Sequence, residues 1–261
     1  MKIKEVMSAL ELFAPLPLQE DWDNAGLQIG LPEAEVSGAL LCLDVDERIV
    51  DEAVAKGCNL IVSHHPLLFH GLKTISNGDS VGRTVMKAIE QHVAVVSMHT
   101  NMDNAKGGVN FKMAEKMSLE NVSFFAKKTV EGMECGSGVV GELPTAMAAD
   151  DFVIAVKGQF GVECAMCNEL LRRPIRRVAI CGGAGDFLID RAIAAGADAF
   201  VTGEMHYHVY FGHEQQIQIC VIGHYQSEQY TNEIFKSIIG EACPQLPTCL
   251  AETDTNPIIY L

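Results

Sequence analysis

An internal repeat constrains the fold of this chain more than any other feature of its sequence. At an offset of 139 residues, the segments 51–62 and 190–201 share five identical positions, where average composition predicts about one match in thirteen. The identical residues are Asp51, Ala53, Ala55, Gly57 and Val62, aligned with Asp190, Ala192, Ala194, Gly196 and Val201. Duplication of one structural unit explains this match.

Each copy of the repeat has the pattern of a strand, a helix and a second strand, and a further helix and strand follow in both. The expected strands are 39–43, 60–63, 93–97, 178–181, 199–202 and 217–222. The expected helices are 47–56, 81–91, 187–195 and 205–215. Asp44 and Asp46 are interpreted as an acidic cap of the first helix. Apolar strands that alternate with helices predict an α/β protein of two duplicated three-layer domains, with mostly parallel or mixed sheets.

The composition excludes several classes of protein. No apolar run reaches the length of about 18 residues that a membrane span requires, and the amino terminus lacks the pattern of a signal peptide. The formal net charge of −15, without a basic cluster, argues against nucleic-acid binding. Nine scattered cysteines indicate reduced, mostly buried thiols and a cytoplasmic protein. For Cys164 and Cys167, helix packing is favoured over a zinc clip or a redox motif.

Histidines follow three of the expected strands. Ser63-His64-His65-Pro66 ends one strand, while His99 and His224 follow two others and each has a carboxylate four residues later, Asp103 and Glu228. Open α/β sheets place their ligands at the carboxyl ends of the strands, where all four histidines are expected. Imidazole and carboxylate groups in this number are what a pair of divalent cations requires. Adjacent histidines can both reach a ligand only where the strand ends, and Pro66 favours such a turn.

Each of these residues also has a simpler interpretation. His64 and His65 could be a helix cap and a packing residue, Asp103 could form an Asx turn, and His99 could orient a ligand instead of binding metal. Glu228 could be an ordinary first-turn acid of a helix that runs from His224 to about Ile239, with Ser227 as its cap.

Three further motifs are interpreted as mainly structural. Glu204 and His208 have helical i, i+4 spacing and could contact metal, although a substrate wall or a solvated helix face is favoured. The turn from Cys181 to Asp186 is rich in glycine but lacks the spacing of a dinucleotide or P-loop motif. Trp22 is expected to be a buried anchor. The segment 131–150 suggests irregular connections or a short hairpin near Gly138 to Gly141.

Because the last metal candidates follow the second repeat, the chain is expected to return to its first domain. We expect a metal-binding domain formed by residues 1–124 plus 219–261, and a second α/β domain, 125–218, inserted into it.

Six motifs in a fixed order resemble those of the Nif-three-like family of dinuclear metal-centre proteins, whose bacterial members are called GTP cyclohydrolase type 2 homologs. The motifs are Asp23-Asn24-x-Gly26-Leu27-Gln28-x-Gly30; Ser63-His64-His65-Pro66; His99-Thr-Asn-x-Asp103 with Gly107-Gly108-Val109-Asn110; Cys181-Gly-Gly-x-Gly; Thr202-Gly203-Glu204; and Gly223-His224-Tyr-x-Ser-Glu228. The resemblance covers nearly the whole chain.

This resemblance implies a dinuclear centre in a toroidal homohexamer, a trimer of dimers. Two divalent ions per subunit, of Zn, Mn, Fe, Co or Ni, would be held by His64, His65, Asp103, His224 and Glu228. Glu228 would bridge both ions and is the catalytic candidate. The implied activity is metal-dependent hydrolysis of a nucleotide-like substrate by metal-activated water. The alternatives are a phosphoester or amide hydrolase and a non-enzymatic protein whose assembly or partner binding is stabilised by metal.

Overall fold

The computed structural model describes residues 1–260, which form two compact units. Unit 1 consists of Met1–Ala105 and Thr231–Pro257, and unit 2 consists of Lys106–Tyr230 with the residues from Ile258 onward. The breaks between the units therefore fall at 105/106 and 230/231, and not at 124/125 and 218/219 as the sequence pattern suggested. The first break comes earlier because α5 (Val109–Lys116) packs against the second sheet, on strands β6 and β8. The second comes later because β10 (Gln218–Val221) is a strand of that sheet.

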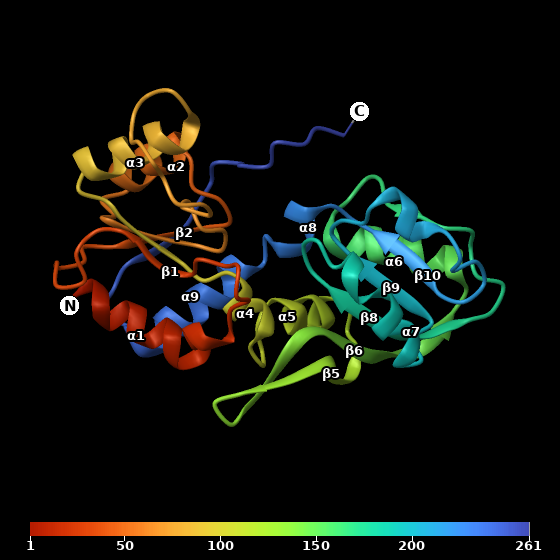
Figure 1. Cartoon of the computed structure of the whole chain (residues 1–261). Helices are drawn as coiled ribbons and strands as arrows, with labels where there is room; N and C mark the ends of the chain where they lie inside the picture. The colour runs from red at the N-terminus through yellow and green to blue at the C-terminus, as the bar shows by residue number, and fades with distance from the viewer. Residues whose placement is uncertain (261) are drawn as a thin grey trace. The chain divides into compact units, whose positions relative to one another are not determined.

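Unit 1 has a five-stranded sheet between two layers of helices. In spatial order the strands are β1 (Gly26–Ile29), β4 (Ala94–Ser97), β3 (Leu60–Ser63), β2 (Ala39–Cys42) and β11 (Thr248–Leu250). All are parallel except β1. The helices α2 (Glu47–Ala55) and α3 (Ser80–Glu90) cover one face, and α1 (Ile3–Phe13) and α9 (Thr231–Ala242) cover the other (Figure 1).

Unit 2 has a six-stranded mixed sheet. In spatial order the strands are β5 (Glu120–Val130), β6 (Met133–Met147), β8 (Ile175–Cys181), β9 (Ala199–Thr202), β10 (Gln218–Val221) and β7 (Met166–Cys167). The helices α5 and α6 (Ala149–Phe160) pack on one face through residues such as Met113 and Phe152. The helix α7 (Ile189–Ala194) packs on the other face through Ile189 and Ala192. Both units are therefore three-layer α/β structures, as the repeat predicted.

The registers of the two sheets carry the internal repeat. In unit 1, Ala39 pairs with Leu60 across the parallel strands β2 and β3, and in unit 2, Val178 pairs with Ala199 across β8 and β9. Both pairs are related by the sequence offset of 139. The strand that follows β9 in the second copy of the repeat is β10. It begins earlier in the chain than the offset of 139 from its counterpart β4 would place it. The helix expected at 205–215 was therefore wrong, and the segment contains only the short 3₁₀-helix η3 (Tyr207–Tyr210).

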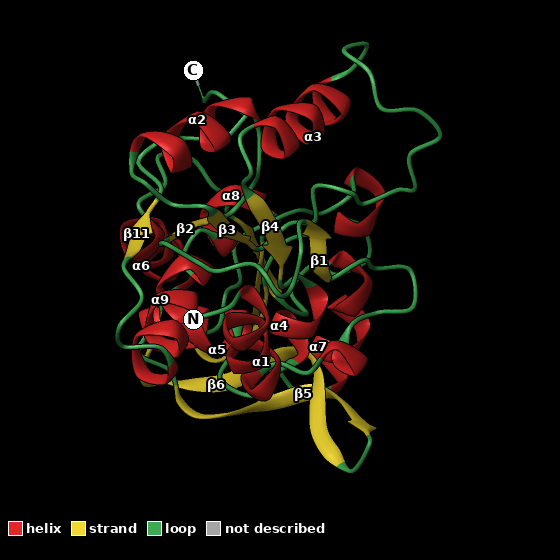
Figure 2. Ribbon diagram, turned by 90° about the vertical axis from the view of Figure 1, so that its left-hand side faces the viewer, coloured by secondary structure: helices red, strands yellow, loops and turns green. Residues whose placement is uncertain are grey.

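The long β5–β6 hairpin differs from the connection that we expected between the halves. Figure 2 shows its two yellow strands, which turn at Glu131 and Gly132, both with positive φ. The expected turn near Gly138 to Gly141 was wrong, because these glycines lie inside β6. A Cβ on Gly138, which has a φ of +70°, would stand 2.5 Å from the ring of Phe125. Gly138 thus allows the ring of Phe125 to lie close to the backbone of β6, and it does not mark a turn.

The longest described helices, α6 and α9, have 12 residues each. No helix within residues 1–260 has the length and apolar character that crossing a membrane would take. All nine cysteines are free thiols, and six of them are buried.

Candidate metal centre

The tandem histidines of unit 1 stand where strand β3 ends. Their backbone N–H groups still donate to strand β2 and its extension, from His64 to Cys42 at 3.2 Å and from His65 to Leu43 at 2.9 Å. The carbonyl of His65 accepts from two hydroxyls, Ser63 Oγ at 2.9 Å and Ser97 Oγ at 3.2 Å. The two imidazole centroids are 5.0 Å apart. The end of the strand thus brings both rings to one place, as expected from the sequence.

His64 is completely buried, and its ring orientation is determined by the backbone. Its Nδ1 lies 2.9 Å from the carbonyl oxygen of Met98. Because a carbonyl can only accept, Nδ1 carries a proton, and in the neutral form of the ring the lone pair lies on Nε2. This Nε2 is 3.6 Å from Asp103 Oδ1.

The separation of His64 Nε2 and Asp103 Oδ1 suits two ligands of one cation. At 3.6 Å it is too long for a hydrogen bond. Two ligand atoms bound at roughly 2.1 Å around a tetrahedral ion are about 3.4 Å apart. The chemistry of the pair, one borderline nitrogen and one hard oxygen, also fits a divalent metal.

His65 and His99 are oriented by carboxylates. His65 Nδ1 lies 2.7 Å from Asp44 Oδ1, and His99 Nδ1 lies 2.7 Å from Asp23 Oδ1. Burial alone would raise the pKa of Asp23, but hydrogen bonds from His99 and Thr100 lower it to about 2. In Asp44, the hydrogen bond from His65 likewise outweighs burial, and the pKa is lowered. Both acids are therefore anionic acceptors at neutral pH.

The three imidazoles of unit 1 form one cluster. His64, His65 and His99 each present a nitrogen within 4.8 Å of the others. Two exposed aromatic rings flank His99: the Trp22 centroid lies 6.0 Å away and the Phe69 centroid 6.1 Å away. Trp22 is 60% exposed, so its predicted role as a buried anchor was wrong. The adjacent residue Asp23 is hydrogen-bonded to His99, and the Trp22 indole therefore lies at the edge of the histidine cluster.

In unit 2, the helix α8 (His224–Glu228) brings together the other two predicted ligands. His224 Nε2 lies 3.0 Å from Glu228 Oε2, and Nδ1 lies 3.1 Å from Glu204 Oε1. Glu228 is only 3% exposed, which is unusual for a carboxylate. The predicted continuous helix from His224 to Ile239 is in fact α8 followed by α9, and Ser227 lies inside α8 and does not cap it.

Two glycines shape the space for α8. A Cβ on Gly183 would stand 2.3 Å from Glu228 Oε1, and a Cβ on Gly203 would stand 2.6 Å from Ser227 Oγ. The N–H of Gly183 donates to that same hydroxyl at 3.0 Å. The glycine-rich turn after β8 therefore accommodates Glu228, in agreement with the preference for a structural turn over a phosphate-binding one.

The structure thus places the predicted residues in two sets, one in each unit. His64, His65 and Asp103 belong to unit 1 with His99, and His224 and Glu228 belong to unit 2. Glu204 is not part of a helix shared with His208, since η3 begins only at Tyr207. It instead orients His224.

The acceptors Asp23, Asp44 and Glu204 were not recognised as such from the sequence. A usable signal existed for Asp44. Strands β2 and β3 are parallel neighbours and Cys42 pairs with Ser63, so Asp44 and His65 extend from the same sheet edge, two residues further on. Asp46 is the true cap of α2 and accepts from Arg48 N and Ile49 N at 2.9 Å. For Asp23, no local pattern indicates contact with His99, 76 residues away.

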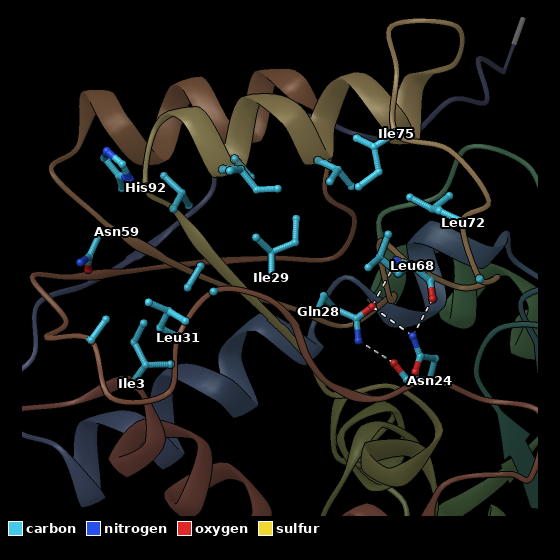
Figure 3. Close-up of a pocket in the computed structure, with 18 of the residues that line it drawn as sticks. Ile3, Asn24, Gln28, Ile29, Leu31, Asn59, Leu68, Leu72, Ile75 and His92 are labelled. Carbon is cyan, nitrogen blue, oxygen red and sulfur yellow. Dashed lines mark hydrogen bonds between the residues drawn. The ribbon is translucent and has the colours of Figure 1, made fainter.

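A cavity of about 810 Å³ lies in unit 1 beside strand β1, with mostly apolar walls. At one end, Asn24 and Gln28 hold the loop that follows the tandem histidines (Figure 3). Asn24 Nδ2 donates to the carbonyl of Leu68 at 2.6 Å, and the Leu68 N–H donates to Gln28 Oε1 at 3.1 Å. These side chains therefore support the course of the chain just after His65 and Pro66.

Comparison with known proteins agrees with this picture. The family model described as Duf34/NIF3 (NGG1p interacting factor 3) matches residues 1–257. The chain is 33% identical over 230 residues to a GTP cyclohydrolase 1 type 2 homolog of Clostridium acetobutylicum, covering 87% of this chain and 85% of that protein. A Campylobacter jejuni protein of the same name is 29% identical over 262 residues, covering all of both chains.

Solved structures share the fold over the whole chain. A crystal structure of a Staphylococcus aureus protein superposes with a TM-score of 0.91 at 27% identity, covering 100% of this chain and 99% of that one. A Bacillus cereus protein related to NIF3 superposes with a TM-score of 0.90 at 24% identity and the same coverage. The motifs, the duplicated fold and the match over residues 1–257 lead to one assignment: this chain belongs to the Duf34/NIF3 family.

Proposed function

We propose that this protein holds two divalent cations and uses them to hydrolyse a nucleotide-like substrate. The ligands would be His64, His65 and Asp103 of unit 1 with His224 and Glu228 of unit 2, and Glu228 would bridge the two ions. His99 would either complete the set or orient it.

One observation carries this proposal. Every candidate histidine has its Nδ1 against an oxygen: the Met98 carbonyl for His64, and the Asp44, Asp23 and Glu204 carboxylates for His65, His99 and His224. Metal-binding histidines almost always donate their second ring N–H in this way, because the contact determines both the tautomer and the ring orientation. A packing or capping histidine has no such requirement, and four such contacts among four candidates support the metal interpretation.

The histidines and the carboxylates of the chain would have different roles in hydrolysis. Divalent ions bound there would supply a water of lowered pKa and polarise the bond to be cleaved. His64 and His65 would bind the cations through their Nε2 lone pairs, whereas Asp103 and Glu228 would contribute negative charge that balances the cations. The burial of Glu228 keeps bulk water away from its carboxylate and strengthens its attraction for a cation. The donor set lacks thiolate and fits Zn, Mn, Fe, Co or Ni.

Two features favour a nucleotide among the substrates of such a centre. Relatives carry the name GTP cyclohydrolase 1 type 2 homolog. In addition, the exposed rings of Trp22 and Phe69, 5.8 Å apart, stand beside His99 and offer faces on which a flat base can stack. With a net charge of −15, the protein repels phosphates at long range, and bound cations would supply a local attraction for them.

Trp22 is the only tryptophan, so its fluorescence reports directly on this rim. We expect GTP to quench the emission of the metal-loaded protein, and inorganic triphosphate at equal concentration to leave the emission nearly unchanged. Equal quenching by both would indicate a response to phosphate alone and would remove the argument for a base beside Trp22.

The decisive experiment is Glu228→Gln, with exposed Glu214→Gln as the matched control. Metal content is measured by plasma mass spectrometry and GTP turnover by chromatography. We expect Glu228→Gln to lose at least one metal equivalent together with activity, and the control to retain both. Two equivalents retained in Glu228→Gln, or full activity after chelation, would refute the proposal. Turnover only with other phosphoesters or amides would move the activity to that class. No turnover, but a lower melting temperature on chelation, would favour a metal-stabilised binding protein.

We further propose a cytoplasmic homohexamer, a toroidal trimer of dimers. The nine free cysteines fit a reducing compartment. Light scattering of the metal-loaded protein should give six times the 28.3 kDa mass of the chain. A dimeric mass would leave the metal centre in place but reject the ring.

A further inference from the structure

Two cysteines of unit 2 face each other across neighbouring strands. Cys167 on the edge strand β7 pairs directly with Cys220 on the antiparallel strand β10. The sequence interpretation of Cys164 and Cys167 as helix-packing residues was wrong. The helix α6 ends at Phe160, where Gly161 adopts a left-handed conformation, and the chain then returns as β7.

The pairing gives these two residues the geometry of a disulfide. Directly opposed residues of an antiparallel pair have Cα atoms about 4.5 to 5.5 Å apart and side chains on the same face. Disulfides typically span Cα separations of about 4.4 to 6.8 Å. Both side chains pack against the core under α6, Cys220 as a buried member and Cys167 as a partly buried neighbour. The register of the two strands is therefore compatible with a bond between these residues.

The surroundings of the pair make its two thiols unequal. Cys220 is completely buried, whereas Cys167 is partly open to solvent. The hydrogen bond from the Cys220 thiol lowers the pKa of Cys167, and contact with Cys167 together with burial raises the pKa of Cys220. Cys167 is therefore both the more accessible thiol for a small oxidant and the better nucleophile of the two.

We propose that Cys167 and Cys220 form a reversible, peroxide-responsive disulfide. The Cys167 thiolate attacks one peroxide oxygen, the O–O bond breaks, and the departing hydroxide takes a proton to become water. The resulting sulfenic acid is then attacked by the sulfur of Cys220, which displaces a second water and closes the S–S bond. Two thiols are oxidised while one peroxide is reduced to two waters. The product fastens β7 to β10, the strand that leads to His224.

Other thiols of the chain provide an internal comparison. Cys58 and Cys249 interact, and burial together with this contact raises the pKa of Cys58. They are not opposed in a sheet ladder, since the partner of Cys249 in the sheet is Leu40. Cys164 is exposed and lies only three residues from Cys167. A disulfide between Cys58 and Cys249, or between Cys164 and Cys167, is therefore a competing product that the same experiment detects.

The test treats the reduced full-length protein with hydrogen peroxide, alkylates the remaining thiols and maps the peptides. We expect a 167–220 cross-link with seven of the nine cysteines still alkylated, reversed by dithiothreitol. Tandem mass spectrometry is needed to locate the bond, because Cys164 and Cys167 share a tryptic peptide. Cys167→Ser should abolish the cross-link, and Cys164→Ser should retain it.

A 164–167 or 58–249 cross-link in the wild-type protein would overturn the proposal. So would an over-oxidised Cys167 without any cross-link while circular dichroism shows the fold intact. Because the wild-type map decides these outcomes by itself, the test does not depend on the folding of either variant. It is also independent of metal binding and of turnover.

Discussion

Replacing Asp44 by Asn tests whether the carboxylate behind His65 serves metal binding. Asp44 accepts from His65 Nδ1 at 2.7 Å and from Thr255 Oγ1 at 3.2 Å. Asparagine keeps the shape and one acceptor oxygen but removes the charge that raises the basicity of the ring. Loss of such a partner typically costs 10- to 100-fold in metal affinity, or about 1.4 to 2.7 kcal/mol. Competition for Zn²⁺ against a chromophoric chelator measures this loss directly.

The neighbouring Asp46→Asn variant is the matched control. Asp46 caps α2 and pairs with the exposed Arg48. Asparagine is as good a helix cap as aspartate, and exposed ion pairs contribute little. The control should therefore keep both the melting temperature and the Zn²⁺ affinity. Unchanged affinity in Asp44→Asn, or an equal loss in both variants, would refute the assigned role of Asp44.

Further predictions concern stability, backbone space and metal removal. Burial would raise the pKa of Glu52, but hydrogen bonds from Lys56 and Thr253 lower it to about 2. Its contribution is present above the unfolded pKa near 4.5 and is lost as the pH falls toward 2, so Glu52→Gln should cost about 1 to 2 kcal/mol at pH 7. Urea unfolding at pH 7 and pH 3 checks this, and an equal cost at both values contradicts it. Gly183→Ala, with its Cβ 2.3 Å from Glu228, should lose metal by mass spectrometry. Gly196→Ala, also at positive φ but in open space, should cost only about 1 kcal/mol and keep its metal. Chelation with EDTA should lower the melting temperature, and Zn²⁺ should restore it; an unchanged melting curve would count against a stabilising site.

The repeat and the strand ends could be predicted from the sequence because they depend on local patterns. Apolar strands and the glycines after helices repeat in order, and the registers that pair Ala39 with Leu60 and Val178 with Ala199 follow the same offset. Candidate ligands at the carboxyl ends of parallel strands could be identified for the same reason.

Features that depend on non-local contacts could not be predicted. In the sequence, His99 and His224 each follow a strand and have a carboxylate four residues later, but the sheets show that their positions differ by one residue. Ser97 pairs with Ser63 and Val221 pairs with Thr202, so the counterpart of His99 in unit 2 is Gly223. The exposure of Trp22 follows from the distant contact of Asp23 with His99, and the failed helix after Glu204 follows from the early arrival of strand β10.

The contacts at Nδ1 bear on how the protein would acquire its ions. Rotation of the four imidazoles is already restricted in the folded chain, so binding a cation would cost little additional side-chain conformational entropy. A zinc finger, in contrast, folds only as it takes up metal. We therefore expect uptake to be governed by exchange of the water molecules around the incoming ion, with amide exchange rates around the histidines changing little between the empty and the loaded protein.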